Sequence, residues 1–155
     1  VDREIGWGLS TRRYPRHDPN HFIVADLDRA FDPGESTPGI VPVSDLTQVL
    51  RFDSGGDITL ATNTYGAGRA VYASGLPWSP DNNRLLHRAI HWAANDEAGF
   101  SQWIASDPRV EIAHWPTGAV LAYNMASEVV TTTIHTPDRQ WSLTLPPGGS
   151  SWQIP

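Results

Sequence analysis

The sequence predicts a two-part fold, an α/β part followed by a small all-β part. Three observations predict it. The apolar runs of the first part share one convincing helix, the apolar period changes to two after Pro108, and turn residues then separate five short runs. We expect the C-terminal part of an α/β domain over residues 1–97, a linker or short helix over 98–109, and a small antiparallel β domain over 110–155.

The first part alternates loops with short apolar runs. Residues 21–26 form an apolar run that ends in Asp26, which predicts a buried strand. Glycine-containing segments at 54–57 and 65–68 separate later runs in the manner of hairpin turns. The remaining strands are predicted at Ile40–Val43, Thr47–Phe52, Ile58–Thr62 and Arg69–Ser74.

The helix is predicted to begin near Ser79. Ser79 can cap the first free amides, Pro80 suits the first helical position, and Asp81 favours the positive end of the helix dipole. One apolar stripe follows at three-to-four spacing, while Arg84, Arg88 and His91 lie off it; the stripe is Leu85, Leu86, Ala89, Ile90 and Ala93.

The strands of the second part alternate in character. In the fourth, Trp141 and Leu143 face one way and Ser142 the other, which is typical of an antiparallel sheet with one wet face. A unit this small, without disulfides, is rarely stable alone, so we expect it to pack against the preceding segment. The strands are predicted at Val110–Trp115, Ala119–Asn124, Val129–Thr136, Trp141–Leu145 and Ser151–Ile154.

The predicted sheet of the first part lacks cover. A sheet of apolar strands requires elements on both faces, and one helix with a small β unit covers little. Either the sheet is open on one side, or further helices belong to polypeptide outside this chain. The second alternative favours a chain that is part of a longer protein.

Composition excludes several chemistries. The 155 residues contain no Cys, and all 11 basic residues are Arg. Disulfides, thiolate metal sites and cysteine nucleophiles are therefore excluded, as are a Schiff-base lysine and a P-loop lysine. The net charge of −6 argues against binding to nucleic acid or an anionic membrane. The chain has no apolar run long enough to span a membrane.

Two motifs near the middle of the chain resemble catalytic or phosphate-binding loops only in part. Gly66-Ala67-Gly68 leads into a strand, whereas a dinucleotide fingerprint leads into a helix, so a hairpin turn is favoured. Ser74 follows a strand but lacks the first glycine of the hydrolase nucleophile motif. We therefore expect no catalytic residue in these segments.

Other polar and aromatic residues leave more than one reading open. Pro19 between His17 and His21 disfavours a helical metal site, which leaves a solvated or capping role or a loop that faces sugar or phosphate. Arg12 and Arg13 form either a solvated pair or a forked phosphate contact. Trp92 and Trp141 are predicted to be core residues, while Trp78, just before the helix, is the candidate for an exposed or interface aromatic.

Four segments carry a family resemblance. The chain resembles the C-terminal part of the bacterial β-1,3-galactosyl-N-acetylhexosamine phosphorylases over most of residues 2–97, and more weakly over 108–155. The segments are DREIG with Leu9-Ser10, DPNHFIVAD at 18–26, YGAGRAVY at 65–72 and GLPWSPDNNRLLHRA at 75–89.

The resemblance implies a parent enzyme with an N-terminal (β/α)₈ barrel, an amidotransferase-like middle α/β domain and a C-terminal β domain. The reaction implied is phosphorolysis with inversion, in which phosphate attacks the galactoside and galactose 1-phosphate forms. The acid that protonates the leaving oxygen lies on the barrel in that family. The resemblance therefore implies no catalytic, cofactor-binding or metal-binding residue here.

The expected partners are the missing barrel and a second copy of the parent, in the cytoplasm, with galactoside and phosphate as the parent's substrates. A carbohydrate-binding module that uses exposed Trp, or a separate interaction domain, is the alternative. Residues that we expect to contact the barrel or a partner are Arg12, Arg13, His17, His21 and Trp78.

Overall fold

The computed structural model describes residues 20–25, 32, 34, 35 and 37–154, which group into two compact units. The first contains the described residues up to Pro77 together with Trp92–Asn95, and the second contains Trp78–His91 and the residues from Asp96 on. The predicted domain boundaries after residues 97 and 109 stay predictions.

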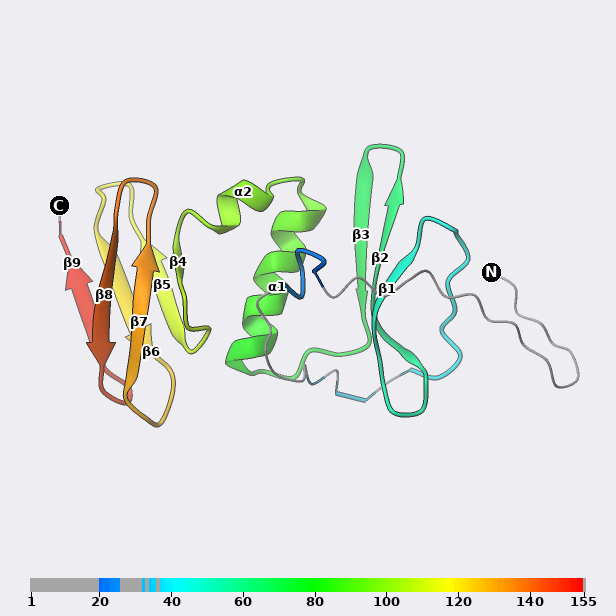
Figure 1. Cartoon of the computed structure of the whole chain (residues 1–155), viewed down its shortest axis with the longest axis horizontal. Helices are drawn as coiled ribbons and strands as arrows, with labels where there is room; N and C mark the ends of the chain where they lie inside the picture. The colour runs from blue at the N-terminus through cyan, green and yellow to red at the C-terminus, as the bar shows by residue number, and fades with distance from the viewer. Residues whose placement is uncertain (1–19, 26–31, 33, 36, 155) are drawn as a thin grey trace, which may run out of the picture. The chain divides into compact units, whose positions relative to one another are not determined.

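A three-stranded antiparallel sheet forms the first unit (Figure 1). Its strands are β1 (Gln48–Phe52), β2 (Ile58–Tyr65) and β3 (Gly68–Ala73), with β2 in the centre. The turn between β2 and β3 contains Gly66 at a φ of +58°, a conformation that glycine adopts without a steric penalty. The strands predicted from 47, 58 and 69 and the hairpin at residues 65–68 are confirmed.

The core of this unit combines the sheet with the residues that end the helix. Val49, Ile58 and Ala61 are buried together, and Tyr72 packs against them. Trp92 is buried, as predicted. Arg69 donates from Nη1 to the Trp92 carbonyl oxygen at 2.9 Å, and its guanidinium carbon lies 4.9 Å from the centre of the Trp92 ring.

Two strand predictions in the first part are wrong. Residues 21–25 form a turn, which the Val24 amide closes by donating to the His21 carbonyl at 2.9 Å; Asp26 lies outside the described residues. Val24 is buried as expected, so burial was predicted correctly and conformation was not. No strand forms at 40–43, where Pro42 lacks the amide that a ladder requires.

Helix α1 (Pro80–Ala93) begins as predicted, because Ser79 Oγ accepts a hydrogen bond from the Asn82 amide at 3.1 Å. The predicted stripe is only partly buried. Leu85 is fully buried, whereas Ile90 is 56% exposed and Arg84, which we expected to lie off the stripe, is 8% exposed. The cause is tertiary, since the Arg84 guanidinium finds a carbonyl partner and lies against an aromatic ring in the second unit.

Two small antiparallel sheets form the body of the second unit, with strand orders β4-β7-β8 and β5-β6-β9 (Figure 1). A short helix, α2 (Glu97–Phe100), precedes them. The last five strands of this unit were predicted, and they are confirmed within a residue or two at their ends. The strands are β4 (Ile104–Ala105), β5 (Val110–His114), β6 (Val120–Asn124), β7 (Val130–His135), β8 (Gln140–Leu145) and β9 (Ser150–Gln153).

The core of the second unit draws residues from both sheets. Trp141 and Leu143 pack against this core while Ser142 and Thr144 are exposed, so the predicted alternation in β8 is confirmed. Strand β4 was not predicted, because two residues carry no periodic pattern. The buried core residues are Ala105, Val110, Ala122, Val130, Ile134 and Leu145.

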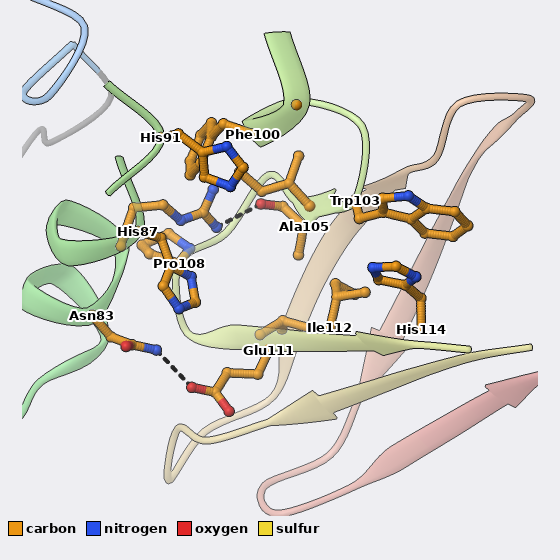
Figure 2. A pocket seen from close by; sticks show the side chains of 14 residues that line it. Asn83, His87, His91, Phe100, Trp103, Ala105, Pro108, Glu111, Ile112 and His114 are labelled. Carbon is orange, nitrogen blue, oxygen red and sulfur yellow. Dashed lines mark hydrogen bonds between the residues drawn. The ribbon is translucent and has the colours of Figure 1, made fainter. Parts of the chain in front are cut away.

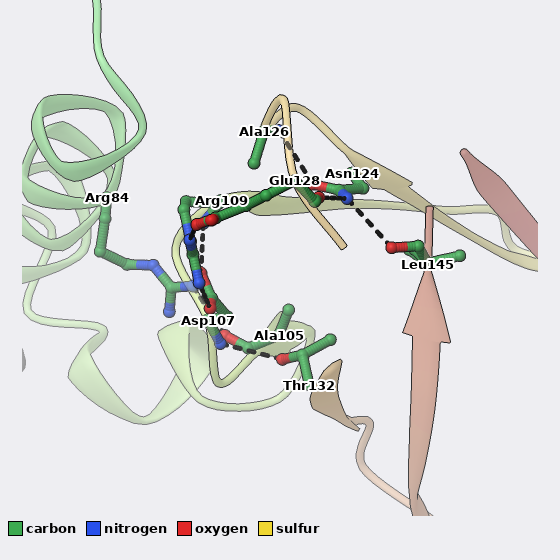
Figure 3. A network of polar contacts seen from close by, with 9 residues as sticks. All are labelled: Arg84, Ala105, Asp107, Arg109, Asn124, Ala126, Glu128, Thr132 and Leu145. Atoms are coloured by element: carbon green, nitrogen blue, oxygen red, sulfur yellow. Dashed lines mark hydrogen bonds and ion pairs between the residues drawn. The ribbon is translucent and has the colours of Figure 1, made fainter. Parts of the chain in front are cut away.

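A polar network fixes the connections between these strands (Figure 3). Asn124 is fully buried, and its Nδ2 lies 2.8 Å from the Glu128 carbonyl oxygen, 3.0 Å from that of Pro146 and 3.2 Å from that of Leu145. Its Oδ1 accepts from the Ala126 amide at 2.8 Å. One side chain thus joins the turn after β6 to the end of β8.

An ion-pair network lies beside Asn124. Arg109 donates from Nε and Nη2 to the two carboxylate oxygens of Asp107 and from Nη1 to Glu128. The hydrogen bond to Asp107 raises the pKa of Arg109 above its ordinary value, and the negative charges of both carboxylates act in the same direction. The guanidinium therefore stays charged at any physiological pH.

The antiparallel β part of the predicted fold is confirmed. In the first unit the described strands pair only antiparallel, and the amidotransferase-like α/β part stays a prediction. Among the described residues, no helix has the length and apolar character needed to cross a membrane.

Candidate functional site

A pocket of about 510 Å³ lies within the second unit, between α1, α2 and the residues of β4 and β5 (Figure 2). This volume falls in the range of about 300–1,000 Å³ that small-molecule sites occupy. Polar side chains come mainly from the helix, and apolar ones from the following segment. The lining residues are Asn83, Arg84, His87, His91, Gly99, Phe100, Trp103, Ile104, Ala105, Pro108, Val110, Glu111, Ile112 and His114.

Helix periodicity places the polar side chains. Asn83, His87 and His91 are spaced four residues apart, so they rise along one face of α1, and all three line the pocket. Arg84 adjoins this face. Since the Ser79 cap fixes the start of the helix, it also fixes which face these residues share.

Two hydrogen bonds join the helix to the strands across the pocket. Asn83 Nδ2 donates to Glu111 Oε1 at 2.7 Å, and Arg84 Nη2 donates to the Ala105 carbonyl oxygen at 2.6 Å (Figure 2). The Arg84 bond is buried, while the Glu111 side chain is exposed to the pocket and solvent. The buried bond holds the helix in place, and the exposed one orients a carboxylate at the mouth.

His91 is held in one position by α2. Its Nδ1 lies 3.0 Å from the Asp96 carbonyl oxygen and 3.2 Å from Asp96 Oδ2, and its ring meets that of Phe100 edge to face at 5.8 Å. Asp96 also caps α2 by accepting from the Gly99 amide. His91 therefore serves as a wall of the pocket and His87 as its accessible imidazole.

An aromatic stack forms the opposite side. The rings of Trp103 and His114 are nearly parallel, at 8°, with 4.2 Å between their centres. Such close stacking restricts the rotation of both side chains. The pocket thus has a fixed apolar side facing a polar side.

The formal charges of the described residues that line the pocket cancel. Arg84 contributes one positive charge and Glu111 one negative charge. Among the described residues, no group of three His, Cys, Asp or Glu side chains is placed to hold a metal ion. The arrangement suits a neutral ligand that presents hydroxyl groups on one face and C–H groups on the other.

The structure places only some of the predicted contact residues. Arg12, Arg13 and His17 lie outside the described residues. His21 belongs to the first unit, where its ring lies 5.4 Å from that of Trp92 and its Nδ1 accepts from the Ile23 amide at 3.2 Å. Trp78 belongs to the second unit and is 76% exposed, which agrees with its prediction as an exposed aromatic.

The pocket residues themselves were not predicted. The four-residue spacing of Asn83, His87 and His91 was a visible signal of a polar helix face. Nothing local joins that face to Glu111, which lies 28 residues from Asn83 along the chain. Only the folded chain brings them together.

A second aromatic feature lies on the β5-β6-β9 sheet. The rings of Trp115 and Trp152 stack at 5.2 Å and 27°, and the side chains are 40% and 56% exposed. Tyr123 is also exposed and lies on the same face of β6 as Leu121, two residues earlier, which the register pairs with Trp152. This sheet therefore presents an aromatic face to its surroundings.

Comparison with known proteins identifies the family to which the chain belongs. Residues 1–98 match the family model described as the lacto-N-biose phosphorylase central domain. The 1,3-beta-galactosyl-N-acetylhexosamine phosphorylase Cphy3030 of Lachnoclostridium phytofermentans is 40% identical over 116 residues, which is 75% of this chain and 16% of that protein.

A second relative aligns with nearly the whole chain. The 1,3-beta-galactosyl-N-acetylhexosamine phosphorylase of Bifidobacterium longum subsp. longum is 39% identical over 186 aligned positions, which cover 99% of this chain and 25% of that protein. The chain thus spans a quarter or less of the length of these two relatives. By the match to the family model and by these identities, the chain belongs to the 1,3-beta-galactosyl-N-acetylhexosamine phosphorylase family.

Proposed function

We propose that this chain is a non-catalytic C-terminal portion of an inverting glycoside phosphorylase. The parent enzyme converts a β-1,3-galactosyl-N-acetylhexosamine and phosphate to galactose 1-phosphate and the free N-acetylhexosamine. The observation that carries the proposal is the match of residues 1–98 to the central-domain model, together with relatives named for this activity.

The chemistry of the parent reaction assigns the chain its role. A carboxylic acid protonates the oxygen that leaves with the N-acetylhexosamine, and a phosphate oxygen bonds to the anomeric carbon from the opposite face. We place that acid on the N-terminal barrel, in the part of the parent that this chain does not contain. Residues 1–97 then form the C-terminal part of an amidotransferase-like α/β domain, and residues 110–155 a β domain.

The partners follow from that role. The chain buttresses the barrel and contributes to a homodimer of the parent, which works in the cytoplasm. Trp78 is the described residue best suited to such a contact, because a large indole that is 76% exposed favours burial against another surface. The predicted contacts of Arg12, Arg13, His17 and His21 belong to the same proposal.

Turnover assays test the non-catalytic role. The 155-residue chain, mixed with lacto-N-biose and phosphate, should release no galactose 1-phosphate, whereas the Bifidobacterium longum relative, assayed beside it, should release it. Clear turnover by the chain alone would overturn the proposal. For the contact role, the chain should associate with a polypeptide that holds the rest of the parent, and Trp78→Ala should weaken that association.

One observation favours a second candidate, a carbohydrate-binding or interaction module. The exposed stack of Trp115 and Trp152 is the kind of apolar surface on which a sugar ring or a partner packs. Calorimetry with galactosides discriminates the two, since micromolar binding that Trp152→Ala removes would favour the module.

A further inference from the structure

We propose that the pocket between α1 and β5 binds one pyranose ring of a neutral sugar, with its hydroxyl groups toward Glu111, Asn83 and His87 and its C–H face toward Trp103. This site goes beyond the structural role proposed above. It is also distinct from the exposed stack of Trp115 and Trp152, neither of which lines the pocket.

The two sides of the pocket differ in the way that a pyranose requires. A sugar ring presents polarised C–H groups on one face and hydroxyl groups around its rim. Trp103 and Ile112 supply apolar surface. His114 stacks on one face of the Trp103 indole, so the polarised C–H groups of the sugar would meet the other, negatively polarised face. Asn83, His87 and Glu111 supply the polar rim (Figure 2).

The polar groups retain unused hydrogen-bonding capacity. The Asn83 bond occupies Glu111 Oε1 and leaves Oε2 as a carboxylate acceptor, while the second Asn83 amide hydrogen remains a donor. Within the described part of the chain, no hydrogen bond is made by the His87 side chain, which is exposed. A carboxylate oxygen, an amide and an imidazole can therefore bind two neighbouring hydroxyl groups at once.

The charge balance selects against other ligand classes. A phosphate group would bring its charge close to the Glu111 carboxylate. Among the described residues that line the pocket, the one guanidinium, that of Arg84, already donates to the Ala105 carbonyl. A cation would find a single carboxylate, without a third His, Asp or Glu ligand in the described residues. A neutral polyhydroxylated ligand meets neither penalty.

Nuclear magnetic resonance titration of the 155-residue chain tests the site. Galactose, N-acetylglucosamine and lacto-N-biose are added in turn, and inorganic phosphate is added separately. We expect at least one of the three sugars to shift the Trp103 indole and His87 resonances in a saturable manner below about 10 mM. Phosphate should leave both resonances unchanged.

Matched variants assign the binding to the pocket. Glu111→Gln retains an acceptor for Asn83 but loses the charge, so it should weaken sugar binding by about tenfold without changing the urea midpoint. His87→Ala should weaken binding while the chain stays folded, because His87 is exposed. Trp152→Ala, which removes an exposed indole outside the pocket, should leave the affinity unchanged.

Three outcomes would overturn the proposal. One is the absence of saturable shifts with all three sugars. Another is saturable binding of phosphate without binding of sugar, which would make the pocket an anion site. The third is sugar binding that Glu111→Gln and His87→Ala leave intact and Trp152→Ala removes, which would place the sugar on the exposed aromatic stack. None of these results depends on whether the parent reaction is the one proposed.

Discussion

The guanidinium of Arg84 donates a buried hydrogen bond to the carbonyl oxygen of Ala105, with 2.6 Å between Nη2 and O. The same guanidinium lies 5.8 Å from the ring centre of Phe100. Arg84 is thus a charged helix residue with a structural role, because its hydrogen bond connects α1 to strand β4 and fixes one wall of the pocket.

Replacing Arg84 should therefore lower stability. Arg84→Met keeps the apolar stem but leaves the Ala105 carbonyl without its donor, which should cost about 2–3 kcal/mol in the free energy of unfolding. Urea unfolding followed by circular dichroism measures this. His87→Ala, three residues further along the same helix and exposed, is the matched control and should change the free energy by less than about 0.5 kcal/mol. Equal midpoints for both variants would contradict the structural role of Arg84.

Substitution of Asn124 should lower the free energy of unfolding strongly, because its side-chain amide makes several buried hydrogen bonds. Asn124→Asp replaces the Nδ2 donor with an oxygen that faces the carbonyls of Glu128, Leu145 and Pro146, so buried acceptors would meet without a proton between them. We expect a loss of at least about 3 kcal/mol at neutral pH, measured by urea unfolding.

Asn63 provides the control for this change. Its Oδ1 accepts from Thr47 Oγ1 at 3.4 Å, so Asn63→Asp keeps the acceptor and should cost less than about 1 kcal/mol. If Asn63→Asp lowered the free energy of unfolding as much as Asn124→Asp, the loss of the buried Nδ2 donor would not explain the effect at Asn124.

Gly149 should not accept a side chain. A Cβ atom there would lie 2.6 Å from Pro146 Cγ and 2.9 Å from the Pro146 carbonyl oxygen, and the Gly149 carbonyl also accepts from the Asn124 amide. Gly149→Ala should lower the free energy of unfolding by about 1–3 kcal/mol, because the turn must open to admit the methyl group. Gly68→Ala, whose Cβ would meet nothing closer than 3.4 Å, is the control and should stay near wild type in a thermal melt.

Replacement of Asn95 by glycine should stabilise the chain. Asn95 lies two residues after the end of α1 and has a φ of +58°. Its amide donates to the Trp92 carbonyl, and the Asp96 amide donates to the His91 carbonyl. This pair of hydrogen bonds requires the left-handed backbone conformation at Asn95, which glycine adopts without a steric penalty. Asn95→Gly should raise the free energy of unfolding by about 0.5 kcal/mol, and Asn95→Ala should lower it by about 1 kcal/mol. The reverse order of the two variants in a urea titration would rule out this account.

Local sequence determined the elements whose signals are local. Ser79 before Pro80 gave the start of α1, because a cap acts within one turn of chain. The alternation around Trp141 gave β8 and its inward face, because side chains in a strand alternate by geometry alone. The family resemblance over residues 2–97 was likewise predicted from sequence, and the match to residues 1–98 confirms it.

The tertiary structure decided what depends on distant partners. Residues 21–25 are as apolar as a strand, yet they form a turn, since a strand requires a neighbour to pair with and sequence does not name one. From its place in the sequence Arg84 was expected to lie off the buried stripe, but the Ala105 carbonyl provides it with a buried partner. Asn83 and Glu111 form one site only because the fold brings the helix against the strand. Caps, turns and alternation are set by neighbours along the chain, whereas the burial of a charge and the walls of a pocket are set by residues that only folding brings near.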